Sequence, residues 1–239
     1  MAKVKGSGVD LGTQVGRLSP LDAAATPPVI EATIPGGAGN DELNGTNAGD
    51  LITGADGNDT VEGDSGNDTI LGGTGNDLLD GEDDNDIVRG EDGNDDLEGS
   101  DGNDSLYGDA GRDILDGGVG NDLLIGGADR DDIEAEGGND KVRGDGGDDK
   151  IEAGDGNDKI SGGPGLDDFI FDGVGLEKDK ITDFADGDNI RFENGPNSFN
   201  DLTITDSAKG AVVAYGNDGS TIVLVGVLAA DLSASDFSF

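Results

Sequence analysis

The chain has 239 residues, 46 of them glycine, and a formal net charge of −40. It contains no cysteine, histidine or tryptophan, and only 4% of its residues are aromatic. This composition excludes disulfides, zinc–thiolate sites, histidine-based metal sites and Ser–His–Asp catalysis. The charge makes nucleic acid and anionic membranes poor partners. It makes divalent cations good ones, because they relieve the self-repulsion of a compact acidic chain.

The N-terminal segment, residues 1–35, precedes the regular part of the chain and is expected to be partly flexible. Met1–Ser19 is mildly basic but lacks the apolar region of a secretory signal peptide. The stretch Pro28–Pro35 is able to form a strand over the first turn of the structure that follows, and an unstructured tail is an equally good interpretation. The longest apolar run, Thr221–Ala230, is far shorter than the ~20 residues that cross a bilayer, so no transmembrane segment is expected.

From Gly36 to Ile170 the chain consists of fifteen consecutive nonapeptides without an insertion. The first position is glycine except at Ala135 and Ala153, and ten of the fifth positions are asparagine. The sixth position is always aspartate: Asp41, Asp50, Asp59, Asp68, Asp77, Asp86, Asp95, Asp104, Asp113, Asp122, Asp131, Asp140, Asp149, Asp158 and Asp167. The eighth position is always apolar: Leu43, Ile52, Val61, Ile70, Leu79, Val88, Leu97, Leu106, Leu115, Leu124, Ile133, Val142, Ile151, Ile160 and Phe169.

Each part of the nonapeptide indicates a local structure. Glycine at the first and fourth positions and asparagine at the fifth tolerate positive φ, so we expect the first six residues to curl tightly. The last three residues, with one apolar residue in the middle, indicate a short strand with a single inward side chain. Two nonapeptides then make one turn, and odd and even repeats stack into two facing parallel sheets. The sequence therefore predicts an all-β fold, a parallel β-solenoid over residues 36–170.

The nonapeptide resembles the GGxGxDxUx unit of the RTX (repeats-in-toxin, haemolysin-type) calcium-binding family. The resemblance implies a right-handed parallel β-roll in which each calcium ion lies between two loops one turn apart. There it takes the sixth-position carboxylates of both loops and carbonyl oxygens from the glycine-rich positions. All fifteen sixth-position aspartates are thus candidate metal ligands. Asp59, Asp77 and Asp95 fall in one column, and Asp68, Asp86 and Asp104 fall in the other.

The number of calcium ions has an upper bound in this arrangement. Fifteen loops stacked along two edges leave about 13 gaps, if every gap takes one ion. Three places depart from the repeat and are expected to be the weakest sites. Asp84 and Asp129 replace the fourth-position glycine, and Asn47–Asp50 lacks the usual Gly-Asn pair.

Such a roll is also expected to need calcium for its stability. One buried apolar residue per nine ordered residues does not offset the entropy lost on folding. Stacking the loops also places aspartates in columns, where they repel one another unless a doubly charged ion lies between them. EF-hands do not fit, because they need a twelve-residue loop between helices. A solvated linker would not need an apolar residue at every eighth position.

After Phe169 the nine-residue period ends and apolar residues become denser. Six segments are predicted to be strands: Phe169–Phe171, Lys180–Phe184, Asn189–Phe192, Asp201–Thr205, Ala211–Tyr215 and Thr221–Val227. The motifs at Asp167–Phe171 (DxFxF) and Ile181–Phe184 (ITDF) resemble the terminal domain of serralysin-like RTX proteins. This resemblance implies that residues 171–239 form a β-rich cap and that the ending Asp236–Phe239 is read by type I secretion machinery. The ending is also expected to serve as the last strand of the cap.

Two groups of outward side chains, one apolar and one basic, are candidates for contact surfaces. On the even repeats the seventh and ninth positions form an apolar stripe of Leu51, Leu71, Ile87, Tyr107, Leu123 and Ile125. We expect this stripe to contact the N-terminal segment or a second copy of the chain, with isolated exposed apolar residues as the alternative. Basic residues gather outward in repeats 12 to 14, at Lys141, Arg143, Lys150 and Lys159. They offset the acidic columns, meet an acidic partner, or form a solvated face.

No enzyme is expected, because HExxH is impossible without histidine, a GxSxG motif is absent, and only 35 residues precede the repeats. An accessory module of mannuronan epimerases is similar, but it assists a catalytic domain that this sequence lacks. The threonine ladder of ice-binding proteins is not sustained. We expect a secreted, extracellular or cell-surface calcium-binding protein that self-assembles in a surface layer, matrix or filament. The alternative is a monomeric calcium-binding or adhesion module for an unidentified ligand.

Overall fold

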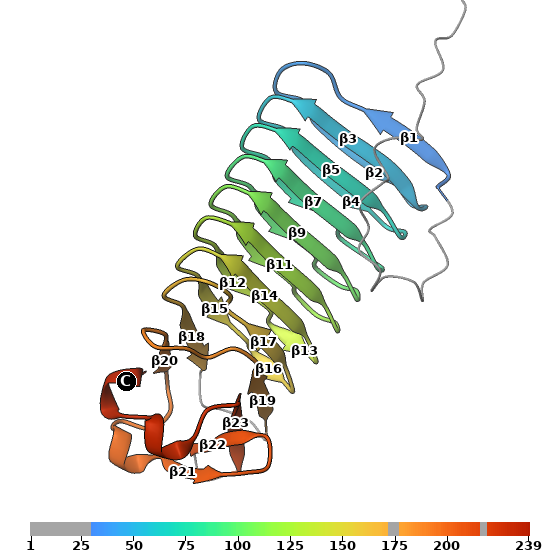
Figure 1. Ribbon diagram of the computed structural model, residues 1–239. Helices are drawn as coiled ribbons and strands as arrows, with labels where there is room; N and C mark the ends of the chain where they lie inside the picture. The colour runs from blue at the N-terminus through green and yellow to red at the C-terminus, as the bar shows by residue number, and fades with distance from the viewer. Residues whose placement is uncertain (1–29, 172–176, 216–218) are drawn as a thin grey trace, which may run out of the picture.

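The computed structural model describes residues 30–171, 177–215 and 219–239. Its coils are stacked along one axis, from β1 at the N-terminal end to a group of short strands at the C-terminal end (Figure 1). Each coil of the repeat region contributes one strand to each of two long sheets. The predicted parallel β-roll is therefore confirmed.

The even repeats contribute seven strands to a twelve-stranded sheet, in which one strand precedes the repeats and four follow them. Strands 18 residues apart pair in parallel register, as Leu51 does with Thr69. Only the last two strands, β22 and β21, run antiparallel to their neighbours. In sheet order the strands are β1 (Ala32–Pro35), β3 (Asp50–Asp56), β5 (Thr69–Thr74), β7 (Ile87–Asp92), β9 (Ser105–Ala110), β11 (Leu123–Ala128), β14 (Lys141–Gly146), β17 (Lys159–Ser161), β19 (Lys178–Ile181), β23 (Ser220–Val225), β22 (Gly210–Tyr215) and β21 (Thr203–Asp206).

The odd repeats contribute eight strands to a ten-stranded parallel sheet that faces the first, and two C-terminal strands complete it. In order its strands are β2 (Glu42–Thr46), β4 (Thr60–Asp64), β6 (Leu78–Asp80), β8 (Asp96–Glu98), β10 (Ile114–Asp116), β12 (Asp132–Glu134), β15 (Lys150–Glu152), β18 (Asp168–Phe171), β20 (Asn189–Phe192) and β24 (Phe237–Ser238). Two loop segments, β13 (Gly137–Gly138) and β16 (Asp155–Gly156), pair separately. Three short 3₁₀ helices, η1 (Phe199–Asp201), η2 (Ala229–Asp231) and η3 (Ala234–Asp236), lie in the C-terminal part.

The eighth-position side chains form the core between the two sheets, as predicted. From Ile52 to Phe169 each is at most 1% exposed, and only Leu43 in the first repeat is partly exposed. Because each strand offers one such side chain, the core of the repeats consists of two facing rows of apolar residues along the axis, one from each sheet. Because the core is thin, the contacts between neighbouring coils contribute much of the stability of the roll.

The turn chemistry differs from the expectation. Within residues 36–170, positive φ occurs at the second and fourth positions, for example 86° at Ala55 and 68° at Glu82, and not at the first or fifth. The first-position glycine has another role: a methyl group built on Gly54 would lie 2.3 Å from Asp59 Oδ2 and 2.5 Å from the carbonyl oxygen of Gly72. Only glycine leaves this space without displacement of its neighbours. The prediction that first-position glycines supply positive φ was wrong, because the constraint comes from the neighbouring coil.

The fifth-position asparagines also differ from the expectation. They form a ladder along the loops, in which the side-chain oxygen of one coil accepts the backbone N–H of the asparagine 18 residues later. The distances are 3.0 Å for Asn76 N to Asn58 Oδ1 and 2.9 Å for Asn94 N to Asn76 Oδ1. Asparagine is therefore present for a hydrogen bond between coils rather than for a left-handed backbone.

The stack of coils does not end with the last nonapeptide. β19 pairs with β17 and β20 pairs with β18, both in parallel and with partners 21 residues apart. β23 and β24 then add a further strand to each sheet. All six segments predicted as strands in this region coincide with strands in the structure, with bounds shifted by a few residues. One insertion of three residues, between β18 and β19, changes the spacing from 18 to 21 for both pairs, and the parallel pairing of the strands is kept.

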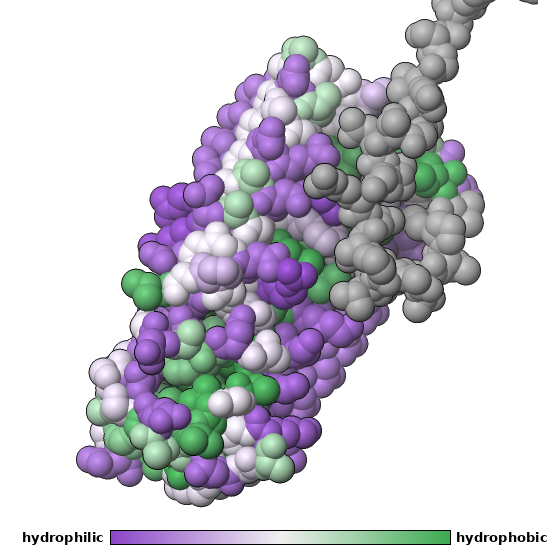
Figure 2. All heavy atoms as spheres, viewed as in Figure 1, coloured by the Kyte–Doolittle hydropathy of each residue, from purple (hydrophilic) through white to green (hydrophobic). Residues whose placement is uncertain are grey.

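Aromatic side chains close the C-terminal end. The rings of Phe192 and Tyr215 are 5.0 Å apart between centroids, and Phe171 and Phe237 lie next to Phe192. Figure 2 shows hydrophobic residues gathered over this end, in contrast to the largely hydrophilic roll above it. The core of the roll thus continues into an aromatic group at this end, and a separate cap over residues 171–239 remains a prediction.

At the N-terminal end, β1 pairs with β3 in the same 18-residue register as the repeats, with Ala32 opposite Asp50. A strand thus lies over the first turn, within the stretch Pro28–Pro35. Residues 1–29, which include most of the N-terminal segment, lie outside the described part of the chain.

The apolar stripe on the even repeats is less exposed than expected. All six of its side chains are half-buried. The Arg89 guanidinium lies 4.5 Å above the Tyr107 ring and pairs with Asp109. The large apolar residues that are exposed lie elsewhere, for example Leu78 at 50% and Ile114 at 51% on the other sheet. Of the outward basic residues, Lys150 contacts Asp132 and Glu134 on its own sheet, so it offsets local acidic charge.

Candidate metal centre

The sixth-position aspartates lie at the two edges of the roll, where each loop enters its strand. From Asp50 to Asp167 their residues are 0–3% exposed, whereas Asp41 in the first repeat is half-buried. Because the coils repeat every 18 residues, the aspartates of odd repeats stack in one column and those of even repeats in the other. The two columns predicted from the sequence are present, and Asp59, Asp77 and Asp95 follow one another in one of them.

One carboxylate oxygen of each aspartate is used within the protein. Oδ1 accepts the backbone N–H of the aspartate 18 residues earlier, with N–O distances of 2.6–3.0 Å throughout the repeats. Each carboxylate therefore reaches back into the gap between its own coil and the preceding one. This contact fixes the carboxylate position, and it explains why the side chain is short and carries an acceptor oxygen at every turn.

The other carboxylate oxygen has no such partner. Oδ2 is buried, and within the described parts of the chain it lacks a hydrogen-bond partner in thirteen repeat aspartates and in Asp179. The thirteen are Asp59, Asp68, Asp77, Asp86, Asp95, Asp104, Asp113, Asp122, Asp131, Asp140, Asp149, Asp158 and Asp167. Each gap between consecutive repeat aspartates of a column thus contains one such oxygen. A buried anionic oxygen without a partner costs several kcal/mol, on the order of the desolvation of a charged group, unless a proton or a cation meets it.

The electrostatics of the columns favour neutralisation. Burial, together with the charge of neighbouring aspartates in the same column, raises the pKa of Asp86 to about 8 and that of Asp104 to about 7. The backbone N–H that each carboxylate accepts acts in the opposite direction and does not compensate. Burial likewise raises the pKa of Asp68 to about 6 and that of Asp131 to about 7. The columns therefore hold carboxylates that are unfavourable as free anions at neutral pH.

Oxygen donors surround these carboxylates. The space left by the missing side chain of Gly108 lies 2.4 Å from Asp113 Oδ2 and 2.5 Å from the carbonyl oxygen of Gly126, on the next coil. The same pair of donors recurs at Gly144, with Asp149 Oδ2 at 2.2 Å and Gly162 O at 2.6 Å. Carboxylate and carbonyl oxygens are the ligands of calcium, and no nitrogen or sulfur ligand is needed. The orphaned oxygens, the glycine space and the donor chemistry all fit a calcium ion.

Each site would draw on few carboxylates. Among the described residues no group of three or more acidic side chains converges on one point. An ion held here would therefore combine one or two aspartates with backbone carbonyls. Calcium accepts such mixed oxygen shells.

The places that depart from the repeat keep the backbone geometry. Asp84 and Asp129 have φ of 82° and 75°, as a fourth-position glycine would allow, and their carbonyl oxygens face the following coil. Asp50 differs in its side chain, because its Oδ2 accepts the backbone N–H of Thr46 at 2.8 Å. The first even aspartate is thus fully hydrogen-bonded. That the ion sites near these three places are weaker remains a prediction.

Two residues outside the nonapeptides join the columns. Asp179 is 0% exposed and its Oδ1 accepts the N–H of Asp158 at 3.0 Å, while Asp188 does the same for Asp167 at 3.1 Å. Neither residue was predicted from the repeat. A usable signal is the triplet Asp-x-apolar, which continues in Asp179–Ile181 and Asp188–Ile190. The change in spacing from 18 to 21 residues hid it from a strict nine-residue count.

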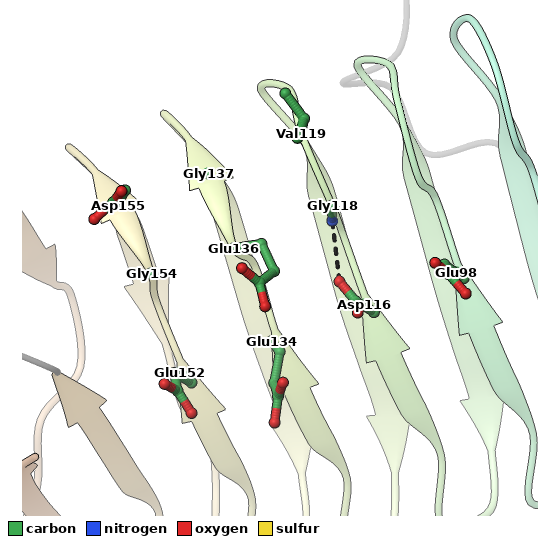
Figure 3. A pocket seen from close by; sticks show the side chains of 10 residues that line it. All are labelled: Glu98, Asp116, Gly118, Val119, Glu134, Glu136, Gly137, Glu152, Gly154 and Asp155. Atoms are coloured by element: carbon green, nitrogen blue, oxygen red, sulfur yellow. Dashed lines mark hydrogen bonds between the residues drawn. The ribbon is translucent and has the colours of Figure 1, made fainter.

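A separate acidic groove of about 540 Å³ runs along the odd-repeat sheet. Four ninth-position side chains, Glu98, Asp116, Glu134 and Glu152, project into it from neighbouring strands, together with Glu136 (Figure 3). Asp116 accepts the backbone N–H of Gly118 at 3.1 Å. The groove adds negative charge to one face of the roll and is distinct from the buried columns.

The fold and the site together define a parallel β-roll with two buried columns of aspartate, one gap per coil. A model of four copies of the RTX calcium-binding nonapeptide repeat matches the overlapping segments 35–70, 62–97, 89–124, 98–133, 120–151 and 134–169, which cover more than half of the chain. The chain belongs to this RTX calcium-binding repeat family, whose nonapeptides bind calcium.

Two solved structures are similar to the chain. The AlgE6R3 subunit of the Azotobacter vinelandii mannuronan C5-epimerase is 29% identical, over 49% of this chain and 79% of that one, with a TM-score of 0.39. The extracellular lipase LipA of Serratia marcescens is 18% identical over 86% of this chain, with a TM-score of 0.36, and the match spans 40% of the lipase. No curated protein gives a significant match. In the described residues no helix is long and apolar enough to cross a membrane.

Proposed function

We propose that this chain is an extracellular calcium-binding structural protein that folds when calcium fills the aspartate columns. The observation that carries the proposal is the buried Oδ2 atom without a partner, repeated once in each gap between thirteen pairs of stacked aspartates. A fold that depended only on its hydrophobic core would not place an unpaired anionic oxygen in every gap. The sixth-position aspartates, Asp41 to Asp167, are the proposed ligands.

In this proposal calcium supplies the positive charge between neighbouring coils. The protein supplies the rest: the Oδ1 hydrogen bonds fix each carboxylate, the first-position glycines leave space beside Oδ2, and the carbonyl oxygens complete an oxygen-only donor set. Without cations the chain has a net charge of −40 and only one core residue per nonapeptide, so the unfolded state is favoured. With cations the two columns become stabilising contacts.

The same physics suits secretion by a type I system. Intracellular calcium is too low to fill weak sites, so the chain stays unfolded for transport and folds outside. The ending Asp236–Phe239 is the proposed secretion signal. In the folded protein Phe237 is 5% exposed and belongs to β24, which pairs with β20. The signal is thus accessible before folding and becomes part of the cap afterwards. Export of the full chain from a type I-competent host, compared with a chain that ends at Ser235, tests this step.

For the biological role we propose assembly in a surface layer, matrix or filament. The first strands of the two sheets, β1 and β2, each have one neighbour among the described strands, and within the described residues their outer edges pair with no other strand. A stiff roll with open strand edges at one end is suited to end-to-end contact. The roll acts as an ion-dependent scaffold in this role, and no catalytic activity is assigned to it.

A monomeric calcium-binding or adhesion module is the second candidate. The observation that favours it is the half-burial of the apolar stripe on the even repeats, which leaves no large apolar strip from Leu51 to Ile125 for a second copy. The acidic groove would then be a surface for a cationic ligand.

A calcium titration of the full chain followed by circular dichroism and sedimentation tests the function and separates the two roles. We expect β-sheet structure to form cooperatively with calcium and not with magnesium at the same concentration. Large particles at saturating calcium support assembly, and a compact monomer supports the module. A chain that is equally ordered in chelator and in calcium would refute the calcium-dependent fold.

A further inference from the structure

The outer face of the ten-stranded sheet carries an uninterrupted row of carboxylates, which we call the acidic ladder. Its members occupy the ninth position on six consecutive strands, and each is the register partner of the next: Glu62, Asp80, Glu98, Asp116, Glu134 and Glu152. Figure 3 shows the last four of them on neighbouring strands. At about 4.8 Å per strand, the acidic ladder is roughly 24 Å long.

The protein itself neutralises little of the acidic ladder. In the described part of the chain its only cationic partner is Lys150, whose Nζ lies 3.1 Å from Glu134 Oε1. Like charges directly opposite one another on neighbouring strands are destabilising. Partial burial, together with the charges of Asp80 and Asp116, raises the pKa of Glu98. The remaining five carboxylates of the ladder therefore repel one another without an ion pair.

The outer face of the twelve-stranded sheet carries a shorter row of lysines, which we call the lysine ladder. Lys141, Lys159 and Lys180 are register partners on the consecutive strands β14, β17 and β19. Lys141 and Lys159 are exposed, and Lys180 is half-buried. Within residues 30–171, 177–215 and 219–239 none of the three forms an ion pair. This face thus has the opposite charge and the same unrelieved repulsion.

The two ladders match in spacing as well as in charge. Both repeat at the distance between neighbouring strands, so three lysines can each meet a carboxylate while both rolls stay undistorted. Apolar side chains flank the carboxylates: Leu78 and Ile114 are 50% and 51% exposed, on the same strands as Asp80 and Asp116. The aliphatic stems of lysines cover such residues while the ammonium groups reach the carboxylates.

We propose that the lysine ladder of one copy of the chain docks on the acidic ladder of a second copy, so that rolls associate side by side. The two ladders lie on opposite sheets, so the contact is heterologous. A pair of copies still presents one free ladder of each kind, and association continues into an open row or layer. This inference deepens the proposed assembly role and rests on it. Calcium enters only because it folds the roll.

Charge reversal on each ladder of the full chain tests the proposal. One variant combines Lys141→Glu with Lys159→Glu, and the other combines Glu62→Lys with Glu98→Lys, all at exposed positions. Sedimentation in saturating calcium at low salt measures the size of the particles. We expect the unmodified chain to form particles that grow with protein concentration, and each variant to stay monomeric.

Mixing the two variants gives the most specific readout. Each variant keeps the ladder that the other has lost, so an equimolar mixture should form one-to-one dimers and no larger particles. The control combines Asp186→Lys with Asp231→Lys, which adds the same charge as the acidic-ladder variant at exposed positions outside both ladders. We expect the control to assemble like the unmodified chain. Circular dichroism in calcium checks that each variant folds.

Two measurements on the unmodified chain keep the proposal testable if a variant does not fold. Sodium chloride at about 1 M, where the Debye length is about 3 Å, should return the particles to monomers. Carbodiimide treatment of mixed ¹⁴N- and ¹⁵N-labelled chains should give amide cross-links between the lysine ladder of one copy and the acidic ladder of another. Particles that persist in salt without such cross-links refute the proposal.

The remaining outcomes separate this inference from the proposed function. A mixture that stays monomeric, or variants that assemble like the unmodified chain, overturns the ladder contact and leaves calcium-dependent folding standing. If only the acidic-ladder variant loses assembly, its partner is another cationic segment, such as the first 29 residues with Lys3, Lys5 and Arg17, and the proposal is wrong. A chain that folds in calcium and stays monomeric at every concentration also overturns it. If calcium does not fold the unmodified chain, the proposed function fails and this inference fails with it.

Discussion

Replacement of one buried column aspartate should have opposite effects with and without calcium. Asp104 lies in the middle of the even column, 1% exposed, and its Oδ1 accepts the N–H of Asp86 at 2.7 Å. Asparagine keeps that acceptor and loses the charge and the anionic Oδ2. Asp104→Asn therefore changes the electrostatics of one gap while the hydrogen bond between coils is retained.

The magnitude follows from the environment of the carboxylate. Burial, with a smaller contribution from Asp122 in the same column, raises the pKa of Asp104 from 3.8 to about 7. At pH 8 a difference of this size makes ionisation cost the metal-free folded state about 4 kcal/mol, which solvent screening lowers to roughly 2–3 kcal/mol. The variant recovers this free energy in the absence of metal. In calcium it leaves an ion short of a charged ligand, and loss of one partner of a buried ion pair costs about 3–5 kcal/mol.

The assay is urea unfolding followed by far-UV circular dichroism at pH 8, in calcium and in chelator. We expect Asp104→Asn to lower the urea midpoint in calcium and to raise the β-sheet content of the chelated sample above that of the unmodified chain. Asp101→Asn is the control, because it removes the same formal charge from an exposed side chain. Destabilisation of the same size in both conditions, or an Asp104→Asn that behaves like Asp101→Asn, refutes the reasoning.

Three further predictions concern pH, backbone strain and the core. The folded pKa of column aspartates such as Asp86 is raised to about 8, so the metal-free folded state binds more protons than the unfolded chain. Its stability is therefore highest below the unfolded pKa of about 3.8 and is lost as pH rises through about 6 to 8. Chelated samples should gain β-sheet signal as the pH is lowered from 8 to 4, and a flat or falling signal contradicts this. In calcium the order reverses, because protons compete for the carboxylates, and the calcium concentration at the folding midpoint should rise as pH falls from 8 to 6. Glu82→Gly should raise the free energy of unfolding in calcium by about 1–2 kcal/mol, because φ of 68° is strained for glutamate and not for glycine. The control Glu62→Gly, in the strand β4, should lower it. Equal changes in both variants contradict this prediction. Leu106→Ala, at a core position with 0% exposure, should lower the free energy of unfolding in urea by about 2–5 kcal/mol. Leu78→Ala, at 50% exposure, should lower it by less than about 1 kcal/mol. Equal losses would mean that the eighth-position side chains do not form the core.

Much of the architecture was available in the sequence because the chemistry of the roll is local and repeated. A nine-residue unit with one apolar residue in the strand and turn residues in the loop predicts two strands per coil, an alternation of odd and even repeats between two sheets, and a core at the eighth position. The same unit predicts two columns of aspartate. The C-terminal strands followed from ordinary alternation and turn signals, for example Asn189–Phe192, which is a strand with those bounds.

The contacts between coils could not be predicted from the sequence. They join residues 18 or 21 positions apart, and no local sequence pattern specifies how those residues meet. Gly54 is glycine because the carboxylate of Asp59 and the carbonyl of Gly72 occupy the space of a side chain, and the left-handed residues prove to be Ala55 and its equivalents. Whether an aspartate is fully hydrogen-bonded, as Asp188 is, or has a bare buried oxygen, as Asp179 has, depends on which backbone N–H the folded loop presents. The sequence thus determined the repeating unit and its ligands, while the tertiary structure decided where the columns end and which of their oxygens need a cation, because those properties exist only between neighbouring coils.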